Sequence, residues 1–362
     1  MQITANMRHI ALLCILVFGL AVSCTADVYY RMTDLAIFND VYSISASDIN
    51  NSGMIVGSAD NKAFTWVPGQ GVRYLDSLPG FENNAATAVN DNGQIVGYVE
   101  HSGYLSRACL WDIDKSVSSL GALPSGEFNQ SSRAYDINEL GLVVGSSTSA
   151  KGFNHAFVWD KTTGMEDLTG AEYIGNSSAN AINDNGTIVG QSHGYAYIWN
   201  GTNDSHYLDQ TDTRLRTASD INNSGQVICQ NYSTTSIGYG YFWGNDGNGS
   251  RQVNPLSSNG YSSITSINNM GQAVGESDSK AIIWDSLNGT QELPTTMPNS
   301  LRACAGAIND NGVIAGYVMD ASYKVHLVTW SPVPEPSCIV TLALGLVSAS
   351  IGGISQYMRC RK

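Results

Sequence analysis

Residues 179–190 read ANAINDNGTIVG, and residues 196–199 read AYIW. Asn183 and Gly186 occupy the first and fourth positions of a four-residue stretch, which is typical of a type I β-turn. Short runs of strand-forming residues flank this turn, so we predict strands over 179–182, 187–190 and 196–199. Leu208 marks a fourth strand. One unit therefore consists of four short antiparallel strands.

This unit recurs seven times. The turn asparagines are 39 to 48 residues apart, about 43 on average, and each unit holds one of the seven tryptophans. A period of 40–45 residues with several short strands is typical of a β-propeller. We predict an all-β fold, a seven-bladed β-propeller with four-stranded blades, over residues 27–332. The asparagines are 50, 90, 138, 183, 222, 268 and 309, and the tryptophans are 66, 111, 159, 199, 243, 284 and 330.

The N-terminal strand is predicted to close the ring. Units one to six each have a leucine in the fourth strand, whereas in unit seven Trp330 runs directly into Ser331 and Pro332. A similar strand stands alone at Tyr29–Phe38, and we expect it to complete blade seven, since an open ring would expose sheet edges. The first strand of each unit would line the axis. Its side chains there are small, with Tyr135 as the exception: Ser47, Thr87, Asn180, Ser219, Thr265 and Gly306.

Composition excludes several classes of protein. Hydrophobic residues make up 43% of the 362 residues, which is enough for a core. Four of the 18 basic residues (Arg8, Arg359, Arg361 and Lys362) lie near the ends, so the stretch from residue 9 to residue 358 carries 14 basic and 31 acidic residues, a net charge of −17. Such a charge repels phosphate backbones, and nucleic acid is not an expected partner. Three of the seven cysteines (Cys109, Cys229 and Cys304) lie in the repeats, where we expect small buried side chains.

Residues 1–26 have the pattern of a secretory signal peptide. Arg8 precedes an uncharged stretch from Ile10 to Val22, and small residues follow up to Ala26. We predict cleavage after Ala26. Two alternatives remain open, acylation at Cys24 as a lipoprotein and an uncleaved membrane anchor.

Residues 333–362 have the pattern of a membrane anchor. Twenty-three uncharged residues, 336–358, begin with the last proline of the Pro-Glu-Pro triplet and precede a basic end. A helix of about 20 residues spans a bilayer, so we predict a C-terminal transmembrane helix whose basic end stays in the cytoplasm.

This arrangement resembles the PEP-CTERM sorting signal of bacteria. The resemblance implies an exosortase-type processing enzyme as partner, an inner-membrane anchor before sorting, and then a cell-surface or extracellular location associated with exopolysaccharide. The matching residues are Pro334, Glu335, Pro336, Arg359, Arg361 and Lys362.

The repeats resemble the HAF family of extracellular repeats, named for the tripeptide His155-Ala156-Phe157. The resemblance covers about residues 28 to 330 and implies an extracellular location without an established activity. Unit five departs from the pattern with Cys229 in place of Gly and Gly240 in place of Ala, and unit seven departs with Leu327 in place of Ala.

The residue before the Ala of each third strand is polar or aromatic, and long loops carry further aromatics to the same face of the propeller. Aromatic rings with polar neighbours stack on sugars, so we predict glycan binding here. The alternative interpretation is a solvated strand edge that covers the ends of the tryptophans. The candidate ligand-binding residues are Tyr104, Arg107, Phe153, His155, Tyr239, Tyr323 and His326.

The sequence contains no catalytic motif. It lacks the Gly-x-Ser-x-Gly elbow and metal-binding histidine spacing, and each Asn-Asp turn has too few carboxylates for calcium. Asp48, Asp136 and Asp220 occupy equivalent positions near the axis, where they either raise one another's pKa at a site or bond within their own blades. We expect no cofactor, no metal and a non-enzymatic binding or structural role. The alternatives are a carbohydrate-binding propeller, or a polysaccharide lyase or hydrolase that uses His155 or His326.

Overall fold

The computed structural model describes residues 29–38, 41, 43–101, 105–112, 116–124, 130–170, 173–201, 205–212, 214–231, 238–244, 247 and 249–333. The chain divides into two compact units, of which residues 30–331 form one and the two terminal segments form the other. The predicted signal peptide, the sorting residues and the C-terminal helix lie outside the described residues. Within the described part, no helix has the length and apolar character needed to span a bilayer.

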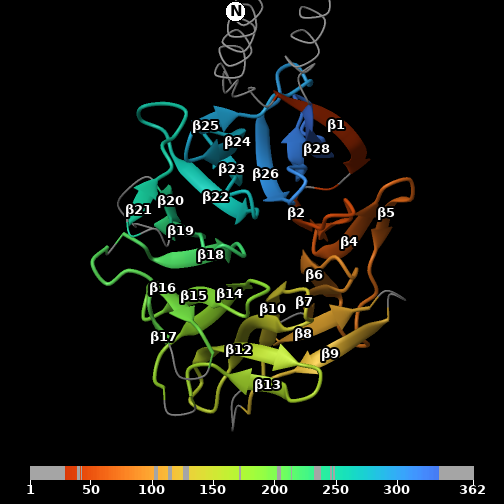
Figure 1. Ribbon diagram of the computed structural model, residues 1–362. Helices are drawn as coiled ribbons and strands as arrows, with labels where there is room; N and C mark the ends of the chain where they lie inside the picture. Colours follow the sequence, from red (N-terminus) through yellow and green to blue (C-terminus); the bar gives the residue numbers. More distant parts are fainter. Residues whose placement is uncertain are drawn as a thin grey trace, which may run out of the picture. The chain divides into compact units, whose positions relative to one another are not determined.

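The described residues form seven four-stranded antiparallel sheets arranged in a ring, which confirms the seven-bladed propeller (Figure 1). Blades one to six each consist of four consecutive strands. Blade one contains β2 (Ile44–Ile49), β3 (Ile55–Ala59), β4 (Lys62–Val67) and β5 (Gly71–Tyr74); blade two β6 (Asn83–Val89), β7 (Ile95–His101), β8 (Leu105–Trp111) and β9 (Val117–Gly121); blade three β10 (Ser132–Ile137), β11 (Val143–Thr148), β12 (Asn154–Asp160) and β13 (Gly164–Asp167).

Blade four contains β14 (Ser177–Ile182), β15 (Ile188–Ser192), β16 (Tyr195–Trp199) and β17 (Ser205–Tyr207); blade five β18 (Thr217–Ile221), β19 (Val227–Asn231), β20 (Tyr239–Trp243) and β21 (Ser250–Gln252); blade six β22 (Ser262–Ile267), β23 (Ala273–Ser277), β24 (Lys280–Asp285) and β25 (Gly289–Glu292). We call the four strands of a blade A to D. The A–B and C–D turns then share one face of the ring, and the B–C and D–A loops share the other.

The N-terminal strand completes blade seven, as the sequence predicted. The sheet order is β1 (Tyr29–Phe38), β28 (Val325–Val333), β27 (Ile314–Met319) and β26 (Arg302–Ile308), so the first strand of the fold pairs with the last. Strand β2 of blade one packs against β26 and β27 (Figure 1). The ring is therefore closed by both ends of the propeller.

A β-bulge in every blade explains the Val-Gly element of the repeat. In blade four the A–B pairing shifts between Ala179 and Ala181, opposite Gly190. A Cβ atom on Gly190 would lie 2.0 Å from the carbonyl oxygen of Ser178, so a side chain does not fit in this backbone geometry. The bulge was not predicted from the sequence, although the glycine that accommodates it was recognised as part of the repeat.

Blade five has Cys229 at this position and a second departure on the next strand. Cys229 is fully buried, and Gly240 replaces the usual Ala of strand C. A Cβ atom on Gly240 would lie 2.6 Å from Cγ1 of Ile264 in blade six, so blade six packs against the bare backbone. The two departures from the repeat thus leave the blade intact.

The core lies between adjacent blades. Trp111, Trp199 and Trp330 are among the largest fully buried side chains. The indole N–H of Trp111 donates to the carbonyl of Asp76 at 2.7 Å, and that of Trp330 donates to Pro294 at the same distance. Each of these two tryptophans therefore packs in the core and also fixes the loop that leads in from the preceding blade.

Candidate functional site

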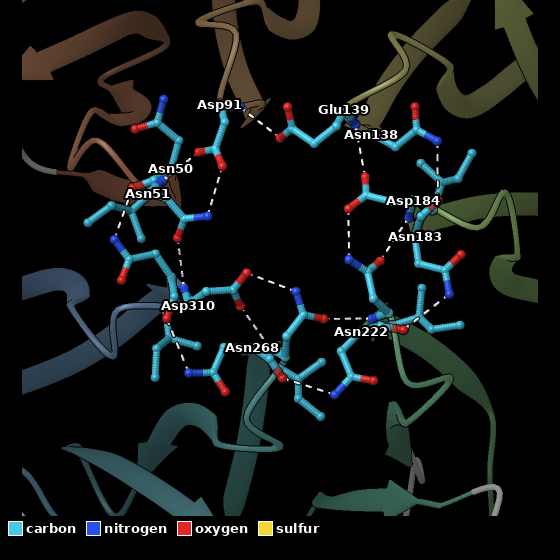
Figure 2. Close-up of a pocket in the computed structure, with 18 of the residues that line it drawn as sticks. Asn50, Asn51, Asp91, Asn138, Glu139, Asn183, Asp184, Asn222, Asn268 and Asp310 are labelled. Carbon is cyan, nitrogen blue, oxygen red and sulfur yellow. Dashed lines mark hydrogen bonds between the residues drawn. The ribbon is translucent and has the colours of Figure 1, made fainter.

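The seven turn asparagines form a closed hydrogen-bonded ring on the A–B face (Figure 2). In each blade the Asn Nδ2 donates to the backbone carbonyl of the equivalent Asn in the next blade, at 2.9 to 3.2 Å. The last bond runs from Asn309 to Asn50. The Asn Oδ1 accepts from the backbone N–H four residues later, and the turn Gly has a φ of +74° to +81°. The sequence indicated the turn but not the bonds between blades.

A second ring uses the residue after each asparagine. Its backbone N–H donates to the side-chain oxygen of its counterpart in the next blade, at 2.7 to 3.0 Å, all the way round the axis. These residues surround an axial pocket of about 160 Å³. Among the described residues, no three His, Cys, Asp or Glu side chains come close enough together to hold a metal ion. The rings use their polar groups to join blades.

Three partly buried aspartates, Asp48, Asp136 and Asp220, also join blades, and we call them the interface aspartates. Each accepts the N–H of the following residue through Oδ1 at 2.7 to 2.8 Å, and an N–H of the next blade through Oδ2 at 2.8 to 2.9 Å. The expectation of bonds within one blade was therefore only half correct. Burial raises the pKa of Asp48 to about 6 and that of Asp220 to about 7, and it raises the pKa of Asp136 well above its usual range.

The residue before the Ala of strand C contacts strand D of its own blade in four blades. His155 is fully buried with Nδ1 2.8 Å from Oδ2 of Asp167. His326 places Nδ1 2.8 Å from Oδ2 of Asp34 and Nε2 3.4 Å from Oδ2 of Asp320. The other two are a Lys280–Glu292 ion pair at 2.6 Å and a Tyr195–Tyr207 ring contact at 5.8 Å.

The candidate residues named from the sequence lie in blades two, three, five and seven. Tyr104 lies outside the described residues. Arg107 is partly buried, and this burial lowers its pKa. Tyr239 packs on the hydrophobic cluster between blades four and five, while Tyr323 is 74% exposed in a turn. Phe153 lies near His155 in blade three. None of the six described candidates lines the axial pocket or the pockets of blades three and four described next.

Blade four instead presents a pocket on the predicted face, which we call the tyrosine pocket. It has a volume of about 390 Å³ and is lined by Tyr195, Tyr207, Asp209, Gln210 and Asp212. The two tyrosine rings are 5.8 Å apart with planes at 81°. Tyr195 begins β16, Tyr207 ends β17, and the other residues belong to the D–A loop that leads into blade five.

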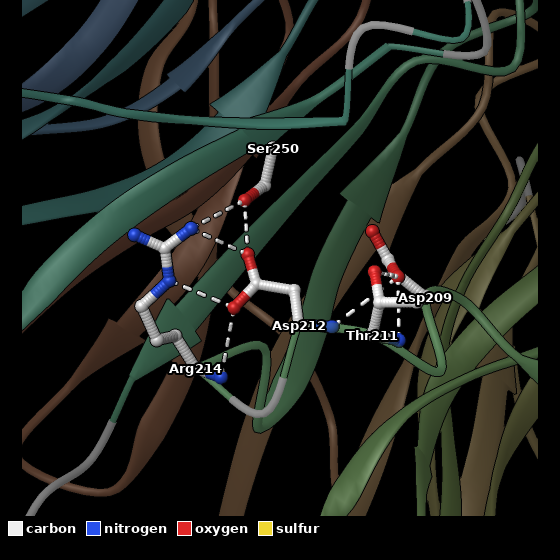
Figure 3. A network of polar contacts seen from close by, with 5 residues as sticks. All are labelled: Asp209, Thr211, Asp212, Arg214 and Ser250. Carbon is white, nitrogen blue, oxygen red and sulfur yellow. Dashed lines mark hydrogen bonds and ion pairs between the residues drawn. The ribbon is translucent and has the colours of Figure 1, made fainter.

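Two ionised carboxylates lie in this loop (Figure 3). Asp209 Oδ1 accepts from the N–H and hydroxyl of Thr211 at 2.8 and 2.7 Å, and these bonds lower the pKa of Asp209. Arg214 donates hydrogen bonds from Nε and Nη2 to the carboxylate of Asp212 at 2.7 Å each, and the hydroxyl of Ser250 donates a third. The bonds from Arg214 are the main reason that the pKa of Asp212 falls to about 2. Asp209 Oδ2 has no hydrogen-bond partner among the described residues.

A second feature of the same face, which we call the polar groove, crosses blades three and four. It comprises two adjoining cavities of about 340 and 520 Å³ that share Tyr135, Ser146 and Asn154. The hydroxyl of Tyr135 lies 2.9 Å from that of Ser146. Tyr135 is the one large side chain among the small axial positions. Its departure from the pattern was visible in the sequence but was not interpreted as a binding residue.

The repeat pattern marks strand C and the B–C loops, so the sequence did not indicate the pocket-lining residues of the D–A loop. Tyr195 was part of the polar-or-aromatic pattern, but Tyr207, Asp209 and Asp212 carry no repeat signal. Only the pairing of strands C and D brings them to Tyr195.

Comparisons with known proteins identify a family model and several propellers. A model for a protein of unknown function, DUF3466, matches residues 61–166. No curated protein sequence matches the chain. The two resemblances drawn from the sequence therefore stay predictions.

Among solved structures, the extracellular domain of BT4673 from B. thetaiotaomicron matches in two structures with TM-scores of 0.54 and 0.52. Both are 10% identical and cover 83% of this chain, and this chain spans about 40% of theirs. The β-propeller domain of the Trilobed protease from Pyrococcus furiosus matches with a TM-score of 0.50 at 11% identity, over 81% of this chain and 94% of that one. That domain is described as having an open velcro topology, whereas here β1 closes the ring. At these identities the similarity establishes the propeller fold alone.

Proposed function

We propose that this protein is an exported, non-enzymatic binding propeller that attaches to extracellular carbohydrate through the tyrosine pocket. The observation that carries the proposal is the pairing of two perpendicular tyrosine rings with an ionised Asp209 whose Oδ2 has no partner in the described part of the chain, all in one pocket of about 390 Å³. The role as a binding platform accords with the rigid, closed ring beneath it.

The chemistry of a sugar matches this pocket. One face of a pyranose carries C–H groups that pack on an aromatic ring, while its hydroxyls donate well to a carboxylate. Asp209 Oδ1 is already held by Thr211, so the second oxygen is fixed in place before a ligand arrives. A pre-positioned acceptor loses little conformational entropy on binding.

Export and surface sorting are also part of the proposal. The signal peptide pattern at residues 1–26 supports export, and the Pro-Glu-Pro segment with its basic end supports an exosortase-type enzyme as the processing partner. The protein would be anchored in the inner membrane before sorting and would then lie at the cell surface or in extracellular polysaccharide. The non-enzymatic role is favoured because His155 and His326 are both buried, and neither lines the axial pocket, the tyrosine pocket or the polar groove.

The test is a binding assay on a polysaccharide panel with the full-length chain. We expect at least one polymer to be bound, and Tyr195→Ala to weaken that binding about tenfold, since an aromatic stacking contact is worth about 1–1.5 kcal/mol. Asp209→Asn should also weaken it. Tyr74→Ala is the matched control, because Tyr74 is a 54% exposed tyrosine on strand D of blade one.

A folded protein that binds nothing on the panel would contradict the carbohydrate proposal. Equal losses in Tyr195→Ala and Tyr74→Ala would place the site elsewhere. Appearance of new reducing ends in the bound polymer, abolished by His155→Ala, would instead support the alternative of a polysaccharide-active enzyme.

A further inference from the structure

The tyrosine pocket and the polar groove meet at His193. This side chain lines the groove, and its ring lies 6.4 Å from that of Tyr207 in the pocket. Gly194, another groove residue, immediately precedes Tyr195. The two cavities of the groove in turn share Tyr135 and further residues. Three cavities therefore follow one another across blades three and four on the same face.

The groove is lined mainly by hydroxyl and amide side chains. Ser178 and Gln191 face each other on adjacent strands of blade four, and their side chains make no hydrogen bond to other described residues. Asn154 accepts from Thr148 through Oδ1, which leaves its Nδ2 without a partner in the described part of the chain. Uncharged donors and acceptors of this kind suit the hydroxyls of a sugar chain.

The groove also offers no unpaired positive charge to an anionic ligand. Its one charged lining residue that is not a histidine, Arg133, forms an ion pair with Glu100 and lies over the ring of Tyr98 at 4.9 Å. The stretch from residue 9 to residue 358 carries a net charge of −17. A polyanion would be repelled by this charge and would find no free cation among the described groove residues, while Arg216 beside the pocket lies over the ring of Tyr195 at 4.7 Å.

We propose that the tyrosine pocket and the polar groove together bind an internal stretch of a linear, uncharged polysaccharide, with one sugar in the pocket and the following sugars along the groove. This inference rests on the proposed function and adds the length and charge of the ligand. A single-sugar site needs only the pocket, whereas consecutive cavities provide one subsite after another. Binding should therefore strengthen with chain length until the cavities are filled.

The experiment measures affinity against ligand length by calorimetry with the full-length chain. The probes are dextran, galactomannan and hydroxyethyl cellulose as neutral polymers, alginate as an acidic one, and oligosaccharides of defined length made by hydrolysis of the neutral polymer that binds best. The groove variant is Gln191→Ala combined with Ser178→Ala. The pocket variant is Tyr195→Ala, and Tyr74→Ala is the control.

For the unaltered protein we expect affinity to rise about tenfold or more between a disaccharide and a chain long enough to fill three cavities. The groove variant should weaken long chains about fivefold, the loss of one or two hydrogen bonds, and leave the disaccharide unchanged. The pocket variant should weaken all lengths. Unchanged melting temperatures of the groove variant would show that it remains folded.

The outcomes separate this inference from the proposed function. No binding of any polysaccharide overturns both. Equal affinity for the disaccharide and the long chain, with an effect of the pocket variant alone, overturns the inference and leaves the tyrosine pocket as a single-sugar site. Tighter binding of alginate than of every neutral polymer overturns the assignment of an uncharged ligand.

Discussion

Replacing one turn asparagine tests whether the axial ring stabilises the propeller. Asn183 is 5% exposed and makes three side-chain hydrogen bonds. Its Nδ2 donates to the carbonyl of Asn222 in the next blade at 3.1 Å, and its Oδ1 accepts the backbone N–H groups of Asn185 and Thr187 at 3.1 and 2.9 Å. Asn183→Ala removes all three. It leaves the N–H groups of Asn185 and Thr187 unpaired, and the carbonyl of Asn222 keeps only its bond from the N–H of Gly225.

The magnitude follows from these three bonds. A buried hydrogen bond contributes about 1 kcal/mol net, so Asn183→Ala should lower the free energy of unfolding by about 3 kcal/mol. In a domain of this size that corresponds to a melting temperature lower by about 6 °C. The matched control is Asn185→Ala, which removes one exposed bond, Nδ2 to the carbonyl of Asn223 at 2.9 Å, and should cost about 0.5 kcal/mol.

A second substitution at the same position isolates the bond between blades. Asn183→Asp keeps the oxygen that accepts inside the turn but places a second oxygen against the carbonyl of Asn222. At neutral pH two acceptors then face each other in a buried site, whereas the protonated acid donates a hydrogen bond again.

We therefore expect the stability difference between Asn183→Asp and the unaltered protein to shrink as the pH falls from 7 to 4. The assay is thermal unfolding followed by circular dichroism at each pH. An Asn183→Ala variant no less stable than Asn185→Ala would refute the reasoning, as would a pH-independent deficit in Asn183→Asp.

Three further predictions follow from the blade interfaces. Burial raises the pKa of each interface aspartate above its unfolded value, so the native state binds more protons than the unfolded state. The melting temperature should therefore rise as the pH falls from about 7 to about 5, by an amount set by about 1.4 kcal/mol per pKa unit. A melting temperature that falls over this pH range contradicts the prediction. Gly306→Ala would put a Cβ atom 2.0 Å from the carbonyl oxygen of Ala46, and it should lower the melting temperature by several °C, as a strained core substitution does. The control is Gly238→Ala, which should lower the melting temperature little because the nearest atom to its Cβ is 3.5 Å away. His326→Ala should loosen β1 by removing the contact with Asp34. Hydrogen exchange would detect this as reduced amide protection confined to β1 and β28, whereas a uniform loss of protection would show that this contact does not act locally on ring closure.

The sequence was sufficient for the fold because each blade repeats the same local signals. The Asn-x-x-Gly turns, the tryptophans and the displaced N-terminal strand together determined the number of blades and the way the ring closes. The bonds between blades were not predictable, since they depend on how neighbouring turns meet at the axis. The site was less predictable still. His155 and His326 looked available in the sequence, yet each proved to contact a carboxylate on strand D or the loop, a pairing that only the sheet register reveals.

The two faces of the ring differ in a way that bears on where a ligand binds. On the A–B face all seven blades use the same asparagine in the same bond, because any blade that departs from it breaks a closed ring. A surface with seven equivalent, mutually bonded positions has few polar groups left for a ligand. On the opposite face the described residues form no such ring, so blades three and four are free to differ, and Tyr135 is the large side chain that departs from the small axial positions. Ring closure therefore leaves polar groups available to a ligand on the face where the repeat is irregular, which is the face that carries the proposed site.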